Sequence, residues 1–469
     1  MIKVGLIPLD SRPCNTIWID SLTKIANLEL LMYPREKCGT LFKGANIDEI
    51  INWLNQNAHL MDYLIISTDG LCFGGLIQAR KAQIDLDKVV KQLDIIKELK
   101  NKYPKLKIHY AMKANYNIAI LKALRDIGCG VDTVSPAEVL MALKLGFDKK
   151  RIIYTANNMT DAEFDRVYST GVVMNIGELS RLEKTAKNYP NSAICLRFNP
   201  DVKDGDSEKT MTAGDLTKFG IMLSDVEKVK EFVKLGNLKV VGLHEHTGSG
   251  LQKAESVYQS MRNLMAIATK ENFPDLEFMD FGGGFKVPYM PDEKRIDYVE
   301  MGSKITEIFE EFCRSYGKEL DMYFEPGKYM VAESGHLLVE VNTIKHNRTR
   351  TIVGCNSGFP QLIRPVMYDA YHHIVNLSNP DGAKQVYDIC GNICETGDRF
   401  AEQREMSEIR EYDILDIQNA GAYCYSMGGV YNLRPMPTEV IWDNNQLTLI
   451  RKAQTDEELI NVIVESSRG

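Results

Sequence analysis

The stretch HYAMKANYN, residues 109–117, joins an apolar run to a lysine and then to a helix-like segment. The run KIHYAM has the length and composition of a short buried strand. Lys113 therefore stands near the carboxyl end of that strand, and residues 117–126 after it are expected to form a helix. Because the carboxyl ends of parallel strands carry the active sites of α/β proteins, this position makes Lys113 a candidate for an active site.

Seven more short apolar runs follow, and helix-like segments such as 136–144 separate them. The eight runs are KIHYAM, GVDTVS, RIIYTAN, VVMN, AICLRFNP, VVGLHEHT, FMDFGGG and MYFEPGKYM. Eight strands alternating with helices over about 220 residues are typical of a (β/α)8 TIM barrel. A doubly wound open sheet is the alternative that this count leaves open. We expect the barrel over residues 107–337.

The sequence on either side of the expected barrel has a different pattern of apolar runs. Residues 338–469 contain runs such as LLVEVNTIKHN, TRTIVGC and QVYDICG, which predict a C-terminal β-domain. Residues 1–106 alternate runs such as KVGLIPL and DYLIIST with expected helices at 15–26, 47–57 and 85–102. The whole chain is therefore predicted to be an α/β protein, in which a small α/β segment precedes the barrel.

Composition excludes several classes of protein. The 469 residues carry a net charge of -8 with no basic block, which argues against a nucleic-acid binder. No apolar window reaches the roughly 18 residues of a membrane span. The ten cysteines form no C-x-x-C pair, so we expect reduced thiols in the cytoplasm and no disulfide framework. No metal site is expected, since no H-E-x-x-H motif is present either.

Residues suited to one cofactor stand at the predicted strand ends. They are Lys113, Asp132, Ser135, His246 with TGSG after it, Gly282 to Gly284, and Glu325 with PGK after it. A glycine run lets backbone N–H groups approach a phosphate. A partly desolvated lysine becomes neutral enough to form a Schiff base, and a carboxylate holds a pyridinium proton. Taken singly, each is more often a surface charge, a turn or a structural histidine, but together they indicate a pyridoxal phosphate site.

Nine motifs carry a resemblance to a known family. They are YAMKAN, GVDTVSPAEV, KFGI, GLHEHTGSG, DFGGGF, EPGKY, LIRPVMYDAYHHI, CETGD and GAYCYSM, in this order from about residue 107. The chain resembles the fold-type III pyridoxal phosphate decarboxylases, and most of all their diaminopimelate decarboxylase branch. The resemblance implies a barrel with a β-domain, pyridoxal 5′-phosphate as cofactor, and a homodimer with shared active sites.

The resemblance also implies a role for each matching residue. Lys113 would form the Schiff base, His246 would stack on the ring, and Glu325 would pair with the ring nitrogen. The phosphate would lie against Ser249, Gly282, Gly283, Gly284 and Tyr423. The substrate's distal carboxylate would meet Arg364 and Tyr368, with Lys328 standing where the family often has arginine. Cys394, the implied proton donor, and Glu395 would reach across the dimer interface.

The implied reaction is decarboxylation of meso-diaminopimelate to L-lysine. Decarboxylation of ornithine, arginine or carboxynorspermidine is the alternative, because the same fold serves those substrates. Residues 1–106 depart from the family: IPLDSRPCN, YPREKCGTLF and STDGLCFGGLIQAR resemble the start of an unrelated bacterial family of unknown function. The chain thus resembles a fusion near KLKIHYAM, and an impaired fusion that only binds the cofactor is a further alternative. Asp10, Arg12 and Asp69 follow strands there, as crevice residues or as caps and turns.

Overall fold

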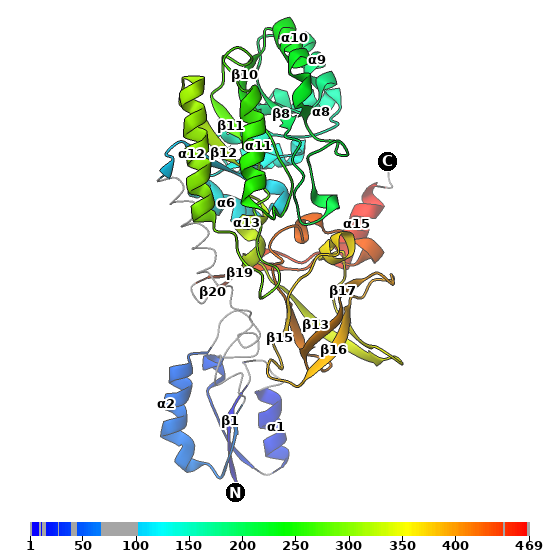
Figure 1. Cartoon of the computed structure of the whole chain (residues 1–469). Helices are drawn as coiled ribbons and strands as arrows, with labels where there is room; N and C mark the ends of the chain where they lie inside the picture. Colours follow the sequence, from blue (N-terminus) through cyan, green and yellow to red (C-terminus); the bar gives the residue numbers. More distant parts are fainter. Residues whose placement is uncertain are drawn as a thin grey trace.

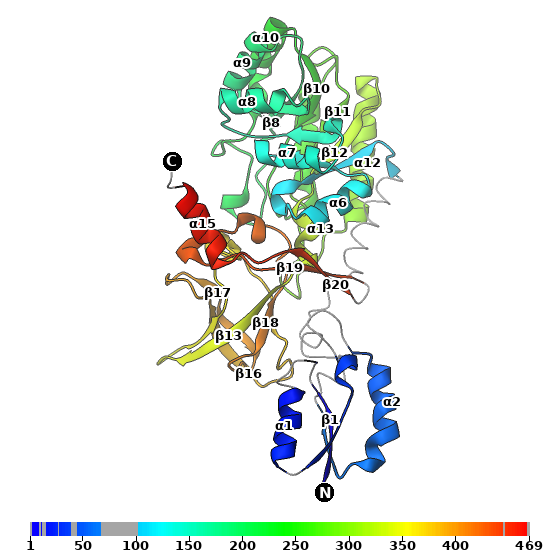
Figure 2. The same ribbon diagram turned by 180° about the vertical axis from the view of Figure 1, so that it is seen from behind.

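A computed structural model describes residues 2–8, 11, 16–26, 28–38, 45–66, 102–443 and 446–466. These residues form three parts, with the helix-rich barrel at one end, a β-domain in the middle and a small α/β unit at the other end (Figure 1). The view from behind shows the same order (Figure 2). Among the described residues, no helix combines the length and apolar character that crossing a membrane requires.

Eight parallel strands close into a barrel. They are β4 (Leu106–Ala111), β5 (Gly130–Thr133), β6 (Ile152–Tyr154), β7 (Val173–Ile176), β8 (Ala193–Asn199), β10 (Lys239–His244), β11 (Phe278–Asp280) and β12 (Asp321–Phe324). Closure comes from two pairings, β8 with β10 and β12 with β4, while the short β9 (Ile221–Met222) pairs only with β8. The eight predicted runs are these eight strands, so the TIM barrel is confirmed and the open sheet was wrong.

Helices cover the outside of the barrel. They are α6 (Ile118–Asp126), α7 (Pro136–Lys144), α8 (Asp161–Tyr168), α9 (Leu179–Asn188), α10 (Val226–Gly236), α11 (Ala254–Ile267) and α12 (Tyr298–Tyr316). Local sequence sets where several of them begin. The side chain of Asn117 accepts the N–H of Ala119, and the hydroxyl of Ser135 accepts the N–H of Glu138. Such caps satisfy backbone donors that the first helical turn leaves free.

The C-terminal β-domain has its own core. Its six-stranded sheet contains β13 (Leu337–His346), β14 (Thr351–Cys355), β15 (Ile374–Asn376), β16 (Lys384–Cys390), β17 (Arg399–Ser407) and β18 (Ile414–Ile417). The remaining elements are the hairpin of β19 (Glu439–Asp443) and β20 (Gln446–Arg451), and the helices α14 (Arg364–Tyr368) and α15 (Asp456–Ser466). The short helix α13 (Lys328–Val331) follows β12 and packs in the barrel core. Val341, Val353 and Leu415 are wholly buried between the elements of the β-domain. The predicted β-rich texture is therefore confirmed.

The N-terminal unit is a three-stranded parallel sheet. The central β1 (Lys3–Ile7) pairs with β2 (Glu29–Met32) and β3 (Tyr63–Ile66), and α1 (Ile17–Ile25) and α2 (Ile47–Asn57) accompany it. Ile7, Tyr33 and Ile50 form a small buried cluster. Asp10, Arg12, Asp69 and nearly all of the helix expected at 85–102 lie outside the described residues.

Hydrogen bonds tie the loop that carries Lys113 to the β-domain. The carbonyl of Ala114 accepts the N–H of Tyr423 at 2.8 Å and the hydroxyl of Ser426 at 3.0 Å. The side chain of Asn115 donates to the carbonyl of Gly421 at 3.0 Å. A Cβ on Gly421 would lie 1.8 Å from the carbonyl oxygen of Val331, so only glycine allows this approach. The β-domain therefore lies against the carboxyl end of β4 and holds the loop of Lys113 in place.

Replacing Phe309 tests how much the packing of α12 stabilises the barrel. The ring of Phe309 is wholly buried and lies 5.5 Å from the ring of Tyr103 and 5.7 Å from that of Phe281, centroid to centroid. Phe309→Ala is expected to lower the free energy of unfolding by about 3–5 kcal/mol, because it leaves a cavity. Urea unfolding followed by circular dichroism measures this. The neighbouring exposed Glu310→Ala should change it by less than about 0.5 kcal/mol, and equal effects would contradict the packing.

Candidate active site

A cavity of about 820 Å³ opens at the carboxyl ends of the barrel strands. Barrel strand ends and two β-domain segments, α14 and the loop around Tyr423, supply its lining. Of the predicted site residues it contains Lys113, His246, Ser249, Glu325, Lys328, Arg364, Tyr368 and Tyr423. These residues are more than 300 positions apart in the sequence at the extremes. The fold thus brings Lys113, His246 and Glu325, predicted from the strand ends, together with Arg364, Tyr368 and Tyr423, which the resemblance implied.

Lys113 lies in a 3-10 turn, Met112–Ala114, directly after β4. Its Nζ is 2.7 Å from Oδ2 of Asp132, a buried residue of β5. Burial lowers the pKa of Lys113, but the negative charge of Asp132 and its hydrogen bond, together with the nearby Glu325, outweigh burial and raise it above its ordinary value. The expectation that desolvation makes this lysine neutral was wrong for the protein alone, because Asp132 stabilises the ammonium form.

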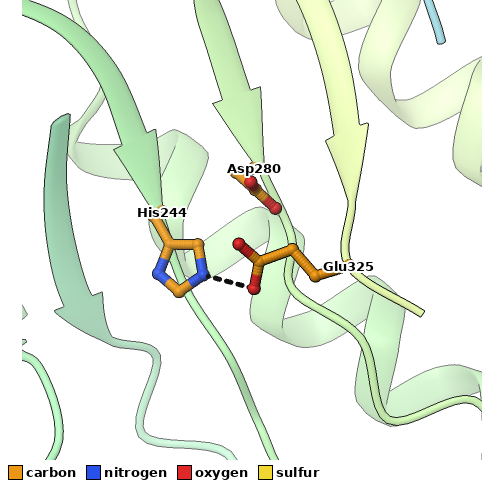
Figure 3. Close-up of side chains that lie close together, drawn as sticks. All are labelled: His244, Asp280 and Glu325. Atoms are coloured by element: carbon orange, nitrogen blue, oxygen red, sulfur yellow. Dashed lines mark hydrogen bonds and ion pairs between the residues drawn. The ribbon is translucent and has the colours of Figure 1, made fainter. Parts of the chain in front are cut away.

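The buried side chains of His244, Asp280 and Glu325 lie close together at the ends of their barrel strands, as Figure 3 shows. Nε2 of His244 lies 3.1 Å from Oε2 of Glu325, and one nitrogen or oxygen from each of His244, Asp280 and Glu325 falls within 4.8 Å of the others. Burial lowers the pKa of His244, so the neutral ring donates from Nε2. Burial and then the charge of Glu325 raise the pKa of Asp280 well above its usual range. Asp280 therefore keeps a proton beside the carboxylate of Glu325.

Several polar atoms in this cluster lack a donor or acceptor among the described residues. They are Oε1 of Glu325, Oδ2 of Asp280, Oδ1 of Asp132 and Nδ1 of His244. A buried polar atom without a partner is costly, and its presence beside a cavity indicates that a ligand supplies the missing bond. The oxygen of Glu325 would suit a ligand with a protonated ring nitrogen.

The glycine run after β11 is shaped by close contacts. The N–H of Gly283 donates to Nδ1 of His246 at 3.1 Å, and the N–H of Gly282 donates to Oδ1 of Asp280 at 3.0 Å. A Cβ on Gly283 would lie 2.2 Å from the carbonyl oxygen of Glu325, and one on Gly284 would lie 2.0 Å from that of Gly248. Only glycine fits at these two positions, because neighbouring backbone atoms occupy the space of a Cβ. The hydrogen bond from Gly283 also holds the ring of His246 beside the turn.

Two cations line the side of the cavity next to the β-domain. The guanidinium of Arg364 lies over the ring of Tyr289 at 4.5 Å, and Nζ of Lys328 lies 5.8 Å from the centre of the same ring. Nη1 of Arg364 donates to Nε2 of His372 at 3.0 Å, because Nδ1–H of His372 donates to the carbonyl of Gln418. Burial and then Arg364 lower the pKa of His372 to about 3, so this partner is neutral.

Cys394 and Glu395 are exposed and do not line the cavity of the same chain. The N–H of Cys394 donates to the side chain of Asn432 at 2.8 Å, and Glu395 accepts the hydroxyl of Tyr431 at 2.6 Å. The structure thus leaves these two predicted site residues apart from the others.

Several residues of the site were not predicted from the sequence to have a role. His244 and Asp280 end their strands, so they could have been predicted along with the other strand-end residues. Asp132 was predicted at a strand end without a partner, and its pairing with Lys113 follows because β4 lies beside β5. Arg197, inside β8, and Asp206, in the loop after β8, gave no sequence signal.

Two family models match the chain. The model described as "Pyridoxal-dependent decarboxylase, pyridoxal binding domain" matches residues 86–332, and a family described as a protein of unknown function matches residues 4–114. These two matches agree with the two resemblances found in the sequence.

Relatives and solved structures agree with the first model. The diaminopimelate decarboxylase of Methanothermobacter thermautotrophicus is 39% identical over 364 residues, which are 76% of this chain and 85% of the relative. That of Escherichia coli is 34% identical over 370 residues, 75% of this chain and 87% of the relative. The structure of diaminopimelate decarboxylase from Helicobacter pylori with L-lysine has a TM-score of 0.73 and 28% identity, covering 81% of this chain and 96% of the other.

Replacing Asp132 tests the electrostatics of Lys113. Asp132→Asn removes a charge that raises the pKa of Lys113, so the neutral amine appears at lower pH. The rate at which the cofactor-free protein captures pyridoxal phosphate, read by absorbance against pH, should therefore reach its midpoint at lower pH. Asp126→Asn, on the exposed face of α6, should leave the midpoint in place. A midpoint that stays or rises in Asp132→Asn would contradict the pairing.

Proposed function

The chain belongs to the pyridoxal-dependent decarboxylase family, and from this premise we propose that it converts meso-diaminopimelate to L-lysine and carbon dioxide. Diaminopimelate decarboxylases are among its relatives at 39% and 34% identity over three-quarters of the chain. The observation that carries the substrate is Arg364, a buried cation that shares a cavity with Lys113 and forms no ion pair within the described residues. A substrate with a second carboxylate supplies the missing partner.

The cavity fits pyridoxal phosphate. Lys113 would carry it, Glu325 would face its ring nitrogen, His246 its ring, and Ser249, Gly282 to Gly284 and Tyr423 its phosphate. Oε1 of Glu325, which accepts no hydrogen bond within the described residues, supports a ligand with a protonated ring nitrogen over a metal ion held by His244, Asp280 and Glu325. When bound, the cofactor supplies an electron sink for the negative charge left by loss of carbon dioxide.

Asp132 positions Lys113 and controls its proton. Its Oδ2 accepts a hydrogen bond from Nζ, which fixes the direction of the amine and favours the charged form. Lys113 can therefore hold a proton at Nζ whenever it is not bonded to another group, and Asp132 keeps that ammonium oriented in the cavity.

Asp280 and His244 position Glu325. Burial raises the pKa of Glu325, and the neighbouring cations Lys113 and Arg197 oppose this increase. The proton that Asp280 keeps and the Nε2–H of His244 both favour a charged Glu325. A charged Glu325 holds a proton on a ring nitrogen, whereas a neutral one would not.

Arg364 is arranged to select a dicarboxylate. His372 occupies one of its five donors as a neutral acceptor, which leaves other donors for a ligand. Binding ornithine would leave the buried guanidinium without a carboxylate, and sites of this kind reject ligands that lack the matching group. We place Tyr368, which lines the same cavity, beside Arg364 at the distal carboxylate.

Cys394 and Glu395 would complete the site of a second copy. Both are exposed here, and the resemblance implies for both a contact with substrate, Cys394 as proton donor and Glu395 beside the distal amino group. A homodimer in which each chain lends these two residues to its partner reconciles these facts. The described cysteines are all free thiols, which supports a reducing compartment, and we propose the cytoplasm.

Carbon dioxide release tests the proposed substrate. The protein should act on meso-diaminopimelate and release little from ornithine, arginine or carboxynorspermidine. Lys113→Ala should abolish release, while Lys107→Ala, at the opposite end of β4 and paired with Asp321, should retain it. Preference for ornithine would contradict the substrate assignment. Cofactor absorbance without turnover of any of these compounds would favour the impaired fusion, in which residues 1–106 disturb the enzyme.

Mixing two inactive variants tests the shared site. Lys113→Ala and Cys394→Ala damage different residues, so a mixed dimer keeps one site in which both are intact. Equal amounts, unfolded and refolded together, should recover roughly a quarter of wild-type activity, since half of the dimers are mixed and each has one of two sites intact. Absence of recovery, with mixed dimers verified by mass spectrometry, would contradict the exchange of Cys394.

A further inference from the structure

Lys328 and Asp206 form an ion pair at the edge of the cavity. Lys328 is the first residue of α13, and only 6% of its side chain is exposed. Asp206 comes from the loop between β8 and β9, and 30% of its side chain is exposed. The two cations beside Tyr289 therefore differ in their partners. Lys328 forms an ion pair with the carboxylate of Asp206, whereas Arg364 donates to the neutral ring of His372.

Asp206 is held firmly against the turn that follows β10. Its N–H donates to the carbonyl of Ser249 at 2.9 Å, and Nε2 of Gln252 donates to its Oδ1 at 3.2 Å. A Cβ on Gly250 would lie 2.0 Å from the carboxyl group of Asp206, so this carboxylate packs directly on the glycine. The remaining oxygen, Oδ2, is the one that meets Lys328.

The chemistry of lysine makes this pair significant. A guanidinium has a planar fork that can bind two acidic groups, whereas an ammonium is one point charge. Burial lowers the pKa of Lys328 and Asp206 opposes this, so the carboxylate helps to keep the buried lysine charged. An anion that enters the cavity at Lys328 must share the charge with Asp206 or displace it.

We propose that Asp206 is an internal counter-ion that competes with the distal carboxylate of the substrate for Lys328. This inference rests on the proposed function, since it concerns the same substrate group. Arg364 is then the main partner of that carboxylate, and Asp206 sets how much Lys328 adds. Asp206 acts through Lys328 and is a positioning residue.

Asp206→Asn in the cofactor-loaded enzyme tests the competition. The probe is pimelate, a dicarboxylate without amino groups, and the measurement is its dissociation constant by titration calorimetry at neutral pH. Release of Lys328 should tighten binding about fivefold, as expected for loss of an ion pair with one partner partly exposed. An unchanged or weaker affinity would overturn the proposal. A purely structural role for Asp206 would weaken binding, so the direction separates the two.

Two further variants control the result. Asp201→Asn removes the same charge from an exposed position of the same loop and should leave the affinity unchanged. An equal gain there would show a general charge effect and overturn the proposal. Lys328→Arg offers a fork for both carboxylates, so it should also tighten pimelate binding, and adding Asp206→Asn should then contribute little. Additive gains in the double variant would contradict competition for a single charge.

The cofactor's phosphate is the other anion that could meet Lys328. The affinity of the cofactor-free protein for pyridoxal phosphate, measured for wild type and Asp206→Asn, separates the two sources. A gain for pyridoxal phosphate and none for pimelate would overturn the assignment to the substrate carboxylate. If wild type releases no carbon dioxide from meso-diaminopimelate, the proposed function fails, whereas turnover with no effect of Asp206→Asn defeats only this inference.

Discussion

The parallel pairing of β12 with β4 is the constraint on which the site depends, because it joins the last barrel strand to the first. Its register sets Met322 against Leu106 and Phe324 against Ile108, and the N–H of Ala111 donates to the carbonyl of Pro326. Glu325 thereby arrives at the same edge as Lys113, although more than 200 residues separate them in sequence. A barrel that failed to close here would leave the lysine and the glutamate on opposite margins of an open sheet.

Closure has an electrostatic consequence, because it gathers acids in a buried space. Asp132, Asp280 and Glu325 are all buried, and Lys113 and Arg197 are the neighbouring cations. A proton retained by Asp280 removes the excess negative charge, since close buried carboxylates do not all ionise. Asp132 is then the charged acid that pairs with Lys113, and Glu325 is the charged acid available to a ligand ring. The packing that closes the barrel therefore also places the two charges that the proposed reaction uses.

Much of the site follows from the amino-acid sequence, for physical reasons. Strand ends in a parallel barrel share one edge, so the sequence alone places Lys113, His246, Gly282 to Gly284 and Glu325 together. The pKa of Lys113 could not be predicted, because it depends on a 2.7 Å contact with Asp132 rather than on burial alone. The role of Asp206 was hidden as well, since its loop has no periodic pattern and its contact with Lys328 joins segments 122 residues apart. The pattern of strand ends says nothing of Cys394 and Glu395, which follow β16 of the β-domain and lie outside the cavity of their own chain.

Chemical trapping can identify the residue to which the cofactor is bonded. The cofactor-loaded enzyme is reduced with borohydride and digested, and its peptides are sequenced by mass spectrometry. We expect a single pyridoxyl group, on Lys113, in the peptide that contains YAMKAN. A label on Lys328 or any other lysine, with Lys113 unmodified, would contradict the assignment of Lys113 on which the site and its chemistry rest.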